Sequence, residues 1–186
     1  MALPSRDQTF AYENCRDLLE KLDREIDRYC AVAGNDEILE PERLLELVDQ
    51  LKDSAFNASV TAWQLCDWVF NDLPVEKRQQ LGFDKLVDLQ NFVRKQCRAL
   101  HLCRQSATAS KHWCVERHAD PTVQTIVTGE TGWTIYFKDG EKKIPADQVF
   151  IAARDFWFAF IRHNEIDKAL DRRALDEAKV DVADQP

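Results

Sequence analysis

The sequence lacks the short motifs that assign many proteins to a functional class. Its 186 residues contain no Cys-x-x-Cys pair and no complete nucleotide-binding, hydrolase or metal-binding motif. No apolar run approaches the roughly 20 residues that a transmembrane helix needs. The first 15 residues contain no apolar stretch flanked by basic residues, which is the pattern of a signal peptide. We therefore expect a cytoplasmic protein that has no membrane contact.

The cysteines do not have the spacing of a disulfide scaffold. Most of them fall within helical patterns, where a free cysteine behaves as a small hydrophobic residue. We interpret all of them as reduced thiols. They occupy positions 15, 30, 66, 97, 103 and 114.

The composition is that of one globular domain with an uneven charge distribution. Hydrophobic residues make up 45% of the chain, including ten Phe and five Trp, which is enough for a sizeable core. The formal net charge is -8, yet residues 90–117 carry six basic residues against one acidic residue, a net of +5. An acidic total argues against nonspecific duplex binding. The basic segment either docks on acidic helices or holds one phosphate-bearing ligand.

Periodicity and turn signals predict the order of the elements. Ser5 is a candidate cap for the first helix, Pro41 starts the second, and Asp84 is a candidate cap for a long third helix. Gly129–Gly132 and Asp139-Gly140 indicate turns between short strands. The predicted helices span 6–31, 41–72 (with a break near Ser54 as an option), 75–81, 84–112 and 146–163, and the predicted strands span 122–128, 132–138 and 142–144.

These elements predict a mainly α fold. We expect a helical bundle of about four helices with a small antiparallel β meander, at about 122–144, inserted before the closing helix. Residues 1–167 form the single predicted domain, and residues 168–186 are interpreted as a charged C-terminal tail.

Asp67 is the first candidate site residue. On a helical wheel it lies beside the apolar arc of the second helix, between Trp63 and Phe56 on one side and Val60 on the other. A carboxylate there is partly desolvated, so it needs a basic partner or takes a raised pKa. Asp67 is therefore either an acid that organises an active site or half of a structural ion pair between helices.

The third predicted helix carries a polar stripe beside its apolar one, ending in the segment Ser106 to Trp113. A solvated surface is the ordinary interpretation of such a stripe. The alternative is metal-free RNA cleavage, in which His112 takes a proton from a 2′-hydroxyl while Arg104 stabilises the developing charge. Asp67 would orient one of these groups. The phosphate-binding candidates are Lys111, Arg98 and His101.

Two segments carry a resemblance to known proteins. Ala62-Trp63-Gln64-Leu65-Cys66-Asp67-Trp68 and Ala109-Ser110-Lys111-His112, with the aromatic helix 149–160, resemble a family of uncharacterised bacterial proteins that have a DW helix and an ASKH helix end. The arrangement also resembles HEPN helical domains, whose catalytic members are metal-independent RNases with an Arg, four to six residues, and a His. Here seven residues separate Arg104 from His112. The resemblance implies an RNA- or protein-binding module, or an RNase that needs no cofactor.

A zinc site is a third hypothesis for the same region. Cys97 and His101 are spaced i, i+4, and His112, Cys114 and His118 follow. Zinc requires four converging ligands, and its usual knuckle spacing is absent here. We therefore assign no residue as a metal ligand.

The last predicted helix indicates an interface. Ile151 and Phe158 fall in an arc of its wheel that otherwise holds charged residues, which is typical of a surface that a second copy of the chain or a protein partner covers. Scattered exposed hydrophobic residues are the ordinary alternative. A non-catalytic interaction module in a multi-protein assembly is thus the rival to an RNA-binding or RNA-cleaving protein.

Overall fold

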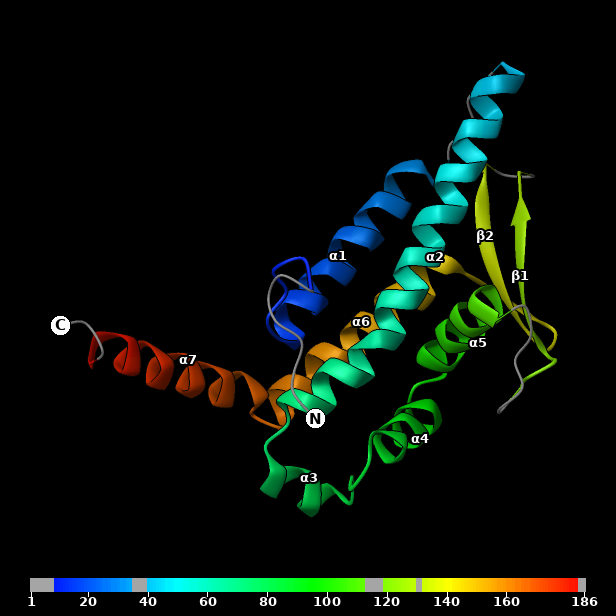
Figure 1. The fold of residues 1–186 in the computed structure, drawn as a ribbon. Coiled ribbons are helices and arrows are strands. Elements are labelled where there is room, and N and C mark those ends of the chain that lie inside the picture. The colour runs from blue at the N-terminus through cyan, green and yellow to red at the C-terminus, as the bar shows by residue number, and fades with distance from the viewer. Residues whose placement is uncertain (1–8, 35–39, 113–118, 130–131, 184–186) are drawn as a thin grey trace.

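The computed structural model describes residues 9–34, 40–112, 119–129 and 132–183. These residues form seven helices and one antiparallel sheet of three strands, so the fold is mainly α as predicted, although about four helices was an underestimate. Figure 1 shows the long helix α2 crossing the molecule, with α1 and α6 along one side of it and the sheet and α5 along the other. No helix in the described residues is long and apolar enough to cross a membrane.

Helix α1 (Cys15–Val32) begins later than the sequence analysis predicted. Its N-cap is Asn14, whose side chain accepts from the backbone N–H of Arg16, while the Asp17 carboxylate accepts the N–H of Asn14. This reciprocal pair satisfies donors that the first turn leaves free. The predicted start near residue 6 was wrong, because residues 9–14 lie outside the helix and Phe10 is 92% exposed. Ser5, the predicted cap, lies outside the described residues.

Helix α2 (Pro41–Asp72) is the centre of the core. It is continuous through Ser54, whose hydroxyl donates to the carbonyl of Gln50, so the optional break does not occur. Its small residues at the centre allow α1, α5 and α6 to pack closely against it. The indole N–H of Trp157 donates to the Ala62 carbonyl at 2.9 Å, which fixes α6 on α2.

The predicted long helix over 84–112 is wrong, because the structure contains two helices there. Helix α4 (Leu86–Gln96) ends at Cys97, which has an extended backbone with φ -127° and ψ 103°, and helix α5 (Arg98–His112) starts at the next residue. A short helix, α3 (Val75–Leu81), precedes α4 and ends at Gly82, whose φ of +72° favours glycine. The bend at Cys97 turns α5 toward the sheet.

The sheet is the predicted meander. Strand β1 (Val123–Thr128) pairs antiparallel with β2 (Thr134–Asp139), which pairs antiparallel with β3 (Lys142–Pro145). Ile135 and Phe137 of β2 are buried against the helices. The buried Tyr29 hydroxyl accepts the backbone N–H of Ile135 at 2.9 Å and thereby links the sheet to α1.

Two helices close the chain. Helix α6 (Ala146–His163) has the predicted bounds and buries Phe150, Trp157 and Ile161. The charged segment after residue 168 forms most of helix α7 (Ile166–Ala183), a helix that the sequence analysis did not predict. Figure 1 shows α7 leading away from the bundle. Ile166 and Leu170 are buried where α7 begins.

Candidate functional site

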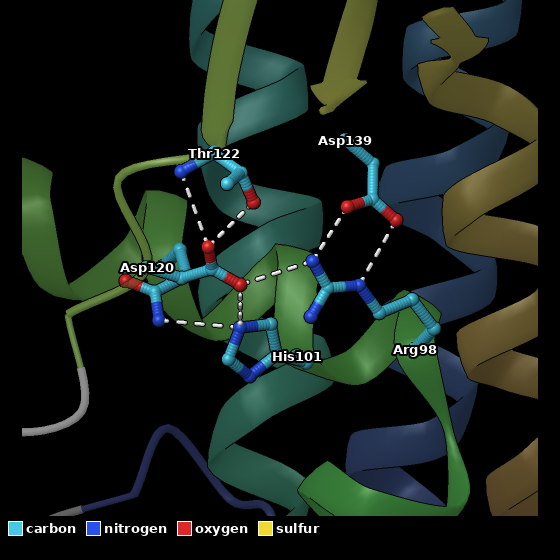
Figure 2. A network of polar contacts seen from close by, with 6 residues as sticks. Arg98, His101, Asp120, Thr122 and Asp139 are labelled. Carbon is cyan, nitrogen blue, oxygen red and sulfur yellow. Dashed lines mark hydrogen bonds and ion pairs between the residues drawn. The ribbon is translucent and has the colours of Figure 1, made fainter. Parts of the chain in front are cut away.

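A cluster of polar side chains joins α5 to the sheet and contains two of the predicted site residues. Figure 2 shows Arg98 and His101 reaching from α5 toward Asp120, Thr122 and Asp139. Arg98 and His101 are three residues apart, so they lie on neighbouring positions of the first turn of α5. The two carboxylates lie where the strands begin and end, because Asp120 precedes β1 and Asp139 is the last residue of β2.

Arg98 is held by two carboxylates. Its Nε donates to Asp139 Oδ2 at 3.0 Å, and its terminal nitrogen donates to Asp139 Oδ1 at 2.6 Å and to Asp120 Oδ2 at 3.0 Å. The bond to Asp139 uses two nitrogens and two oxygens, which is the strong bidentate geometry of arginine and carboxylate. The Asp139 partner raises the pKa of Arg98, and Arg98 in turn lowers the pKa of Asp139.

Asp120 is the hub of the cluster. Its Oδ1 accepts from the hydroxyl of Thr122 at 2.6 Å and from the Thr122 backbone N–H at 3.1 Å, which forms a turn before β1. Its Oδ2 accepts from Arg98 and from His101 Nε2, the latter at 2.9 Å. These donors, the Thr122 hydroxyl first, hold the pKa of Asp120 well below its usual range, so Asp120 is ionised at neutral pH.

His101 is a buried, neutral imidazole. It is 6% exposed, and burial lowers its pKa although the bond to Asp120 opposes that shift. Because ionised Asp120 only accepts hydrogen bonds, the proton of the neutral ring lies on Nε2. The Gln105 amide nitrogen lies 3.4 Å from the same Nε2. A catalytic histidine needs an imidazole nitrogen that a substrate can reach, and this geometry gives a structural role instead.

The charges of the cluster disfavour an anionic ligand. With His101 neutral, one arginine faces two ionised aspartates, so Arg98, Asp120 and Asp139 together carry a net charge of -1. A phosphate would have to displace carboxylates that already satisfy the guanidinium. The assignment of Arg98 and His101 to phosphate binding stays a prediction, and their contacts are those of an internal ion-pair network.

Two small pockets lie between α5 and the sheet, and Asp120 of the cluster lines one of them. One, of about 250 Å³, is bounded by Gln105, Ala109 and Val123. The other, of about 240 Å³, lies between α2, α5 and the sheet, and Phe56 and Phe137 line it. Both are smaller than the roughly 300–1,000 Å³ typical of small-molecule sites. The described residues around them contain no group of three or more side chains that suits a metal ion.

The structure does not bring Arg104 and Asp67 together as an ion pair. Arg104 is 9% exposed, and its guanidinium carbon lies 5.8 Å from the centre of the Trp63 ring. Burial lowers its pKa, and the nearby Arg94 adds to that shift. Burial raises the pKa of Asp67, and within the described residues its carboxylate lies in no salt bridge. The desolvation predicted for Asp67 is therefore present, and of the two predicted consequences, a basic partner or a raised pKa, the described residues give the raised pKa.

Several predicted residues cannot be placed. Lys111 and His112 belong to the last turn of α5, but their side chains lie outside the described part of the chain. The same holds for Cys114 and His118 of the zinc hypothesis, which fall in the segment 113–118. Of the remaining zinc candidates, His101 directs Nε2 to Asp120, and burial raises the pKa of the Cys97 thiol, which disfavours the thiolate that binds metal.

The predicted interface residues lie on the outer surface of α6. Phe158 is 52% exposed and Ile151 is 36% exposed. The charged neighbours Asp155 and Arg162 are exposed, while Arg154 is half-buried. Arg162 places its guanidinium carbon 5.4 Å from the centre of the Phe158 ring. Apolar and charged groups thus alternate on one surface of this helix.

The sequence analysis did not identify Asp120, Thr122 and Asp139 as site residues. It gave Asp139-Gly140 only as a turn signal, and Asp120-Pro121-Thr122 has the pattern of an Asx turn. That pattern was the available signal for Asp120. Nothing in the local sequence connects Asp139 with Arg98, which is 41 residues away.

Comparisons with known protein families, characterised proteins and solved structures found no match for this chain. The function is therefore argued from the geometry of its own residues.

Proposed function

We propose that this chain is a non-catalytic protein-interaction module that binds a protein through the outer face of α6. The observation that carries the proposal is the exposure of Ile151 and Phe158 on a helix whose other side packs into the core. At 100° per residue, side chains seven positions apart project within about 20° of each other. The two apolar groups therefore belong to one surface.

The residues that surround Ile151 and Phe158 on α6 also support the proposal. Ala152 and Ala159 are exposed beside Ile151 and Phe158, and they leave room for the backbone of an incoming helix. Asp155, also exposed, lies within the same arc. A surface that combines apolar, small and charged side chains is compatible with a transient protein interface, which is about as apolar as the rest of a protein surface.

The basic residues of α5 give less support to a nucleic-acid-binding surface than α6 gives to a protein-binding one. Arg98 is bound by two carboxylates, His101 is buried and neutral, and Arg104 is almost wholly buried beside Trp63. Nucleic-acid binding relies on basic side chains that can reach phosphates. Of the six basic residues between positions 90 and 117, Arg98 and Arg104 are therefore engaged within the protein.

Site-specific photocrosslinking tests the proposal. A benzophenone amino acid is placed at position 158 of the full chain, in cells that produce the protein from its own gene, and at exposed position 50 of α2 as the matched control. We expect a discrete protein adduct from position 158 and none from position 50. Adduct mass distinguishes a second copy of the chain from a different protein. Equal yields at both positions, or no adduct at position 158, would contradict the proposal.

The alternative function is RNA binding or cleavage, as the resemblance to HEPN domains implies. In its favour, α5 continues to His112, so Arg104 and His112 share one helix and are about 12 Å apart along its axis. A labelled structured RNA incubated without metal tests it. Cleavage by the wild-type protein that is lost in His112→Ala would replace our proposal with an RNase, while intact RNA with both proteins would leave the interaction module as the function.

A further inference from the structure

We propose that the protein bound by the outer face of α6 is a second copy of this chain, arranged antiparallel about a twofold axis near Phe158 and Ala159. This inference rests on the proposed function, because it names the occupant of the same surface. Symmetric dimers use one patch on both subunits, so the patch must complement itself. The α6 surface meets this condition in shape and in charge.

Three pairs of exposed residues determine the shape of this surface. Each pair is separated by seven positions, so each forms a row along α6. One row is apolar, the second is small, and the third has opposite charges at its two ends. The rows are Ile151 with Phe158, Ala152 with Ala159, and Asp155 with Arg162. At the centre of these rows, the bulky Phe158 and the small Ala159 are adjacent, so an identical antiparallel helix can place its Phe158 over the Ala159 of the first copy.

The third row carries one acidic and one basic side chain. Arg162 is exposed, its guanidinium lies over Phe158, and no carboxylate of the described residues forms a salt bridge with it. Asp155 is exposed and accepts from Arg154 through Oδ1 at 2.7 and 2.9 Å, while no described contact uses Oδ2. The surface therefore presents one acidic and one basic group that are both accessible from outside.

These two charges define the position of the axis. Asp155 and Arg162 lie 3.5 residues on either side of the point between Phe158 and Ala159, or about 5 Å along the helix. A twofold axis through that point brings each Asp155 opposite the Arg162 of the second copy and each Phe158 opposite the second Ala159. Two oppositely charged pairs then flank the central apolar contact. An axis through Asp155 itself would instead bring like charges together, which costs binding energy.

Sedimentation of the full chain and of two charge-reversed variants tests the arrangement. We expect the wild type to dimerise in the micromolar range, because one helix pair makes an interface of modest size. Asp155→Arg and Arg162→Asp should each weaken dimerisation about tenfold or more, since each brings like charges together twice. An equimolar mixture of the two variants should dimerise like the wild type. In the mixed dimer, both arginines of the first variant face the two aspartates of the second.

The matched controls reverse the exposed ion pair Asp49–Lys52 of α2 in the same way. Asp49→Arg and Lys52→Asp should leave the dimer unchanged. If Asp155→Arg and Arg162→Asp dimerise as strongly as the wild type, the dimer does not use the outer face of α6. If the equimolar mixture of the two variants stays monomeric, the antiparallel register is wrong. A wild-type chain that is monomeric at 100 µM would overturn the second copy as occupant. In that case an adduct of different mass at position 158 would still support the interaction module.

Discussion

The α5–sheet cluster and the outer face of α6 use charged residues in opposite ways. In the cluster, Arg98, Asp120 and Asp139 satisfy one another within 2.6–3.0 Å, and a buried histidine completes the network. On α6, Asp155 and Arg162 are exposed, and Arg162 rests on an aromatic ring instead of a carboxylate. The first arrangement supports the fold, and the second leaves binding capacity at the surface.

This difference shows that sequence charge alone does not indicate which charged side chains are accessible. The basic segment between residues 90 and 117 stands out in the sequence, yet Arg98 is neutralised by carboxylates that lie 22 and 41 residues further along the chain. Helix α6 has no such excess of charge, and its Ile151 and Phe158 were singled out by their positions on the helical wheel instead. Accessibility, rather than local charge excess, decides which group can meet a ligand.

The largest expected effect comes from removing the hub of the cluster. Asp120→Ala deletes the acceptor of His101, Arg98 and Thr122 together, and it leaves a buried imidazole N–H without its partner. We expect the free energy of unfolding to fall by about 2–3 kcal/mol, measured by urea denaturation. Asp49→Ala removes an exposed carboxylate as the control and should cost less than about 0.5 kcal/mol. Equal losses in the two variants would contradict the structural role of the cluster.

Acidification tests the same cluster with a smaller effect. The pKa of His101 is lowered in the folded protein, so the unfolded chain binds its proton first, near the ordinary value of about 6.5. The stability that neutral His101 contributes is thus complete above that pH and falls as the pH drops toward its folded value. We expect urea midpoints to decrease as the pH falls below about 6.5.

Substitution of His101 isolates this contribution. His101→Gln keeps a hydrogen-bond donor but removes the titrating group, so its midpoints should vary less with pH over the same interval. His163→Gln, at an exposed position of α6, is the matched control and should follow the wild type. If the two variants show the same pH dependence, His101 does not titrate as its burial requires. Asp120, whose pKa is lowered, adds a second loss of stability only below about pH 4.

The sequence predicted well those parts of the fold that local patterns determine. Helix α6 follows Pro145 and a strong apolar period, and the meander follows strand alternation bounded by Gly and Asp, so both were confirmed. The bend at Cys97 was missed because no Gly or Pro marks it. It turns α5 so that Arg98 reaches the two aspartates, a tertiary interaction that helical periodicity does not contain.

The candidate site residues also divide into those that local sequence patterns predict and those that depend on tertiary contacts. The desolvation of Asp67 and the exposure of Ile151 and Phe158 follow from positions on a helical wheel, and both are present in the structure. The partners of Arg98 and His101 depend on which turn of the sheet lies against α5, so no local pattern could name them. Contacts between residues that are far apart in the chain are therefore the part of a site that could not be predicted from this single sequence.

The smallest expected effect on stability comes from substitutions on the outer face of α6. Ile151→Ser with Phe158→Ser removes two exposed apolar groups that make no contribution to the core, so the free energy of unfolding of dilute protein should change by less than about 0.5 kcal/mol. The wild-type melting temperature should rise with protein concentration, because a dimer stabilises the folded state by mass action. The double variant should melt at one temperature at every concentration. Calorimetry over a hundredfold concentration range measures both properties, and a concentration-independent wild type would show that α6 does not couple association to folding.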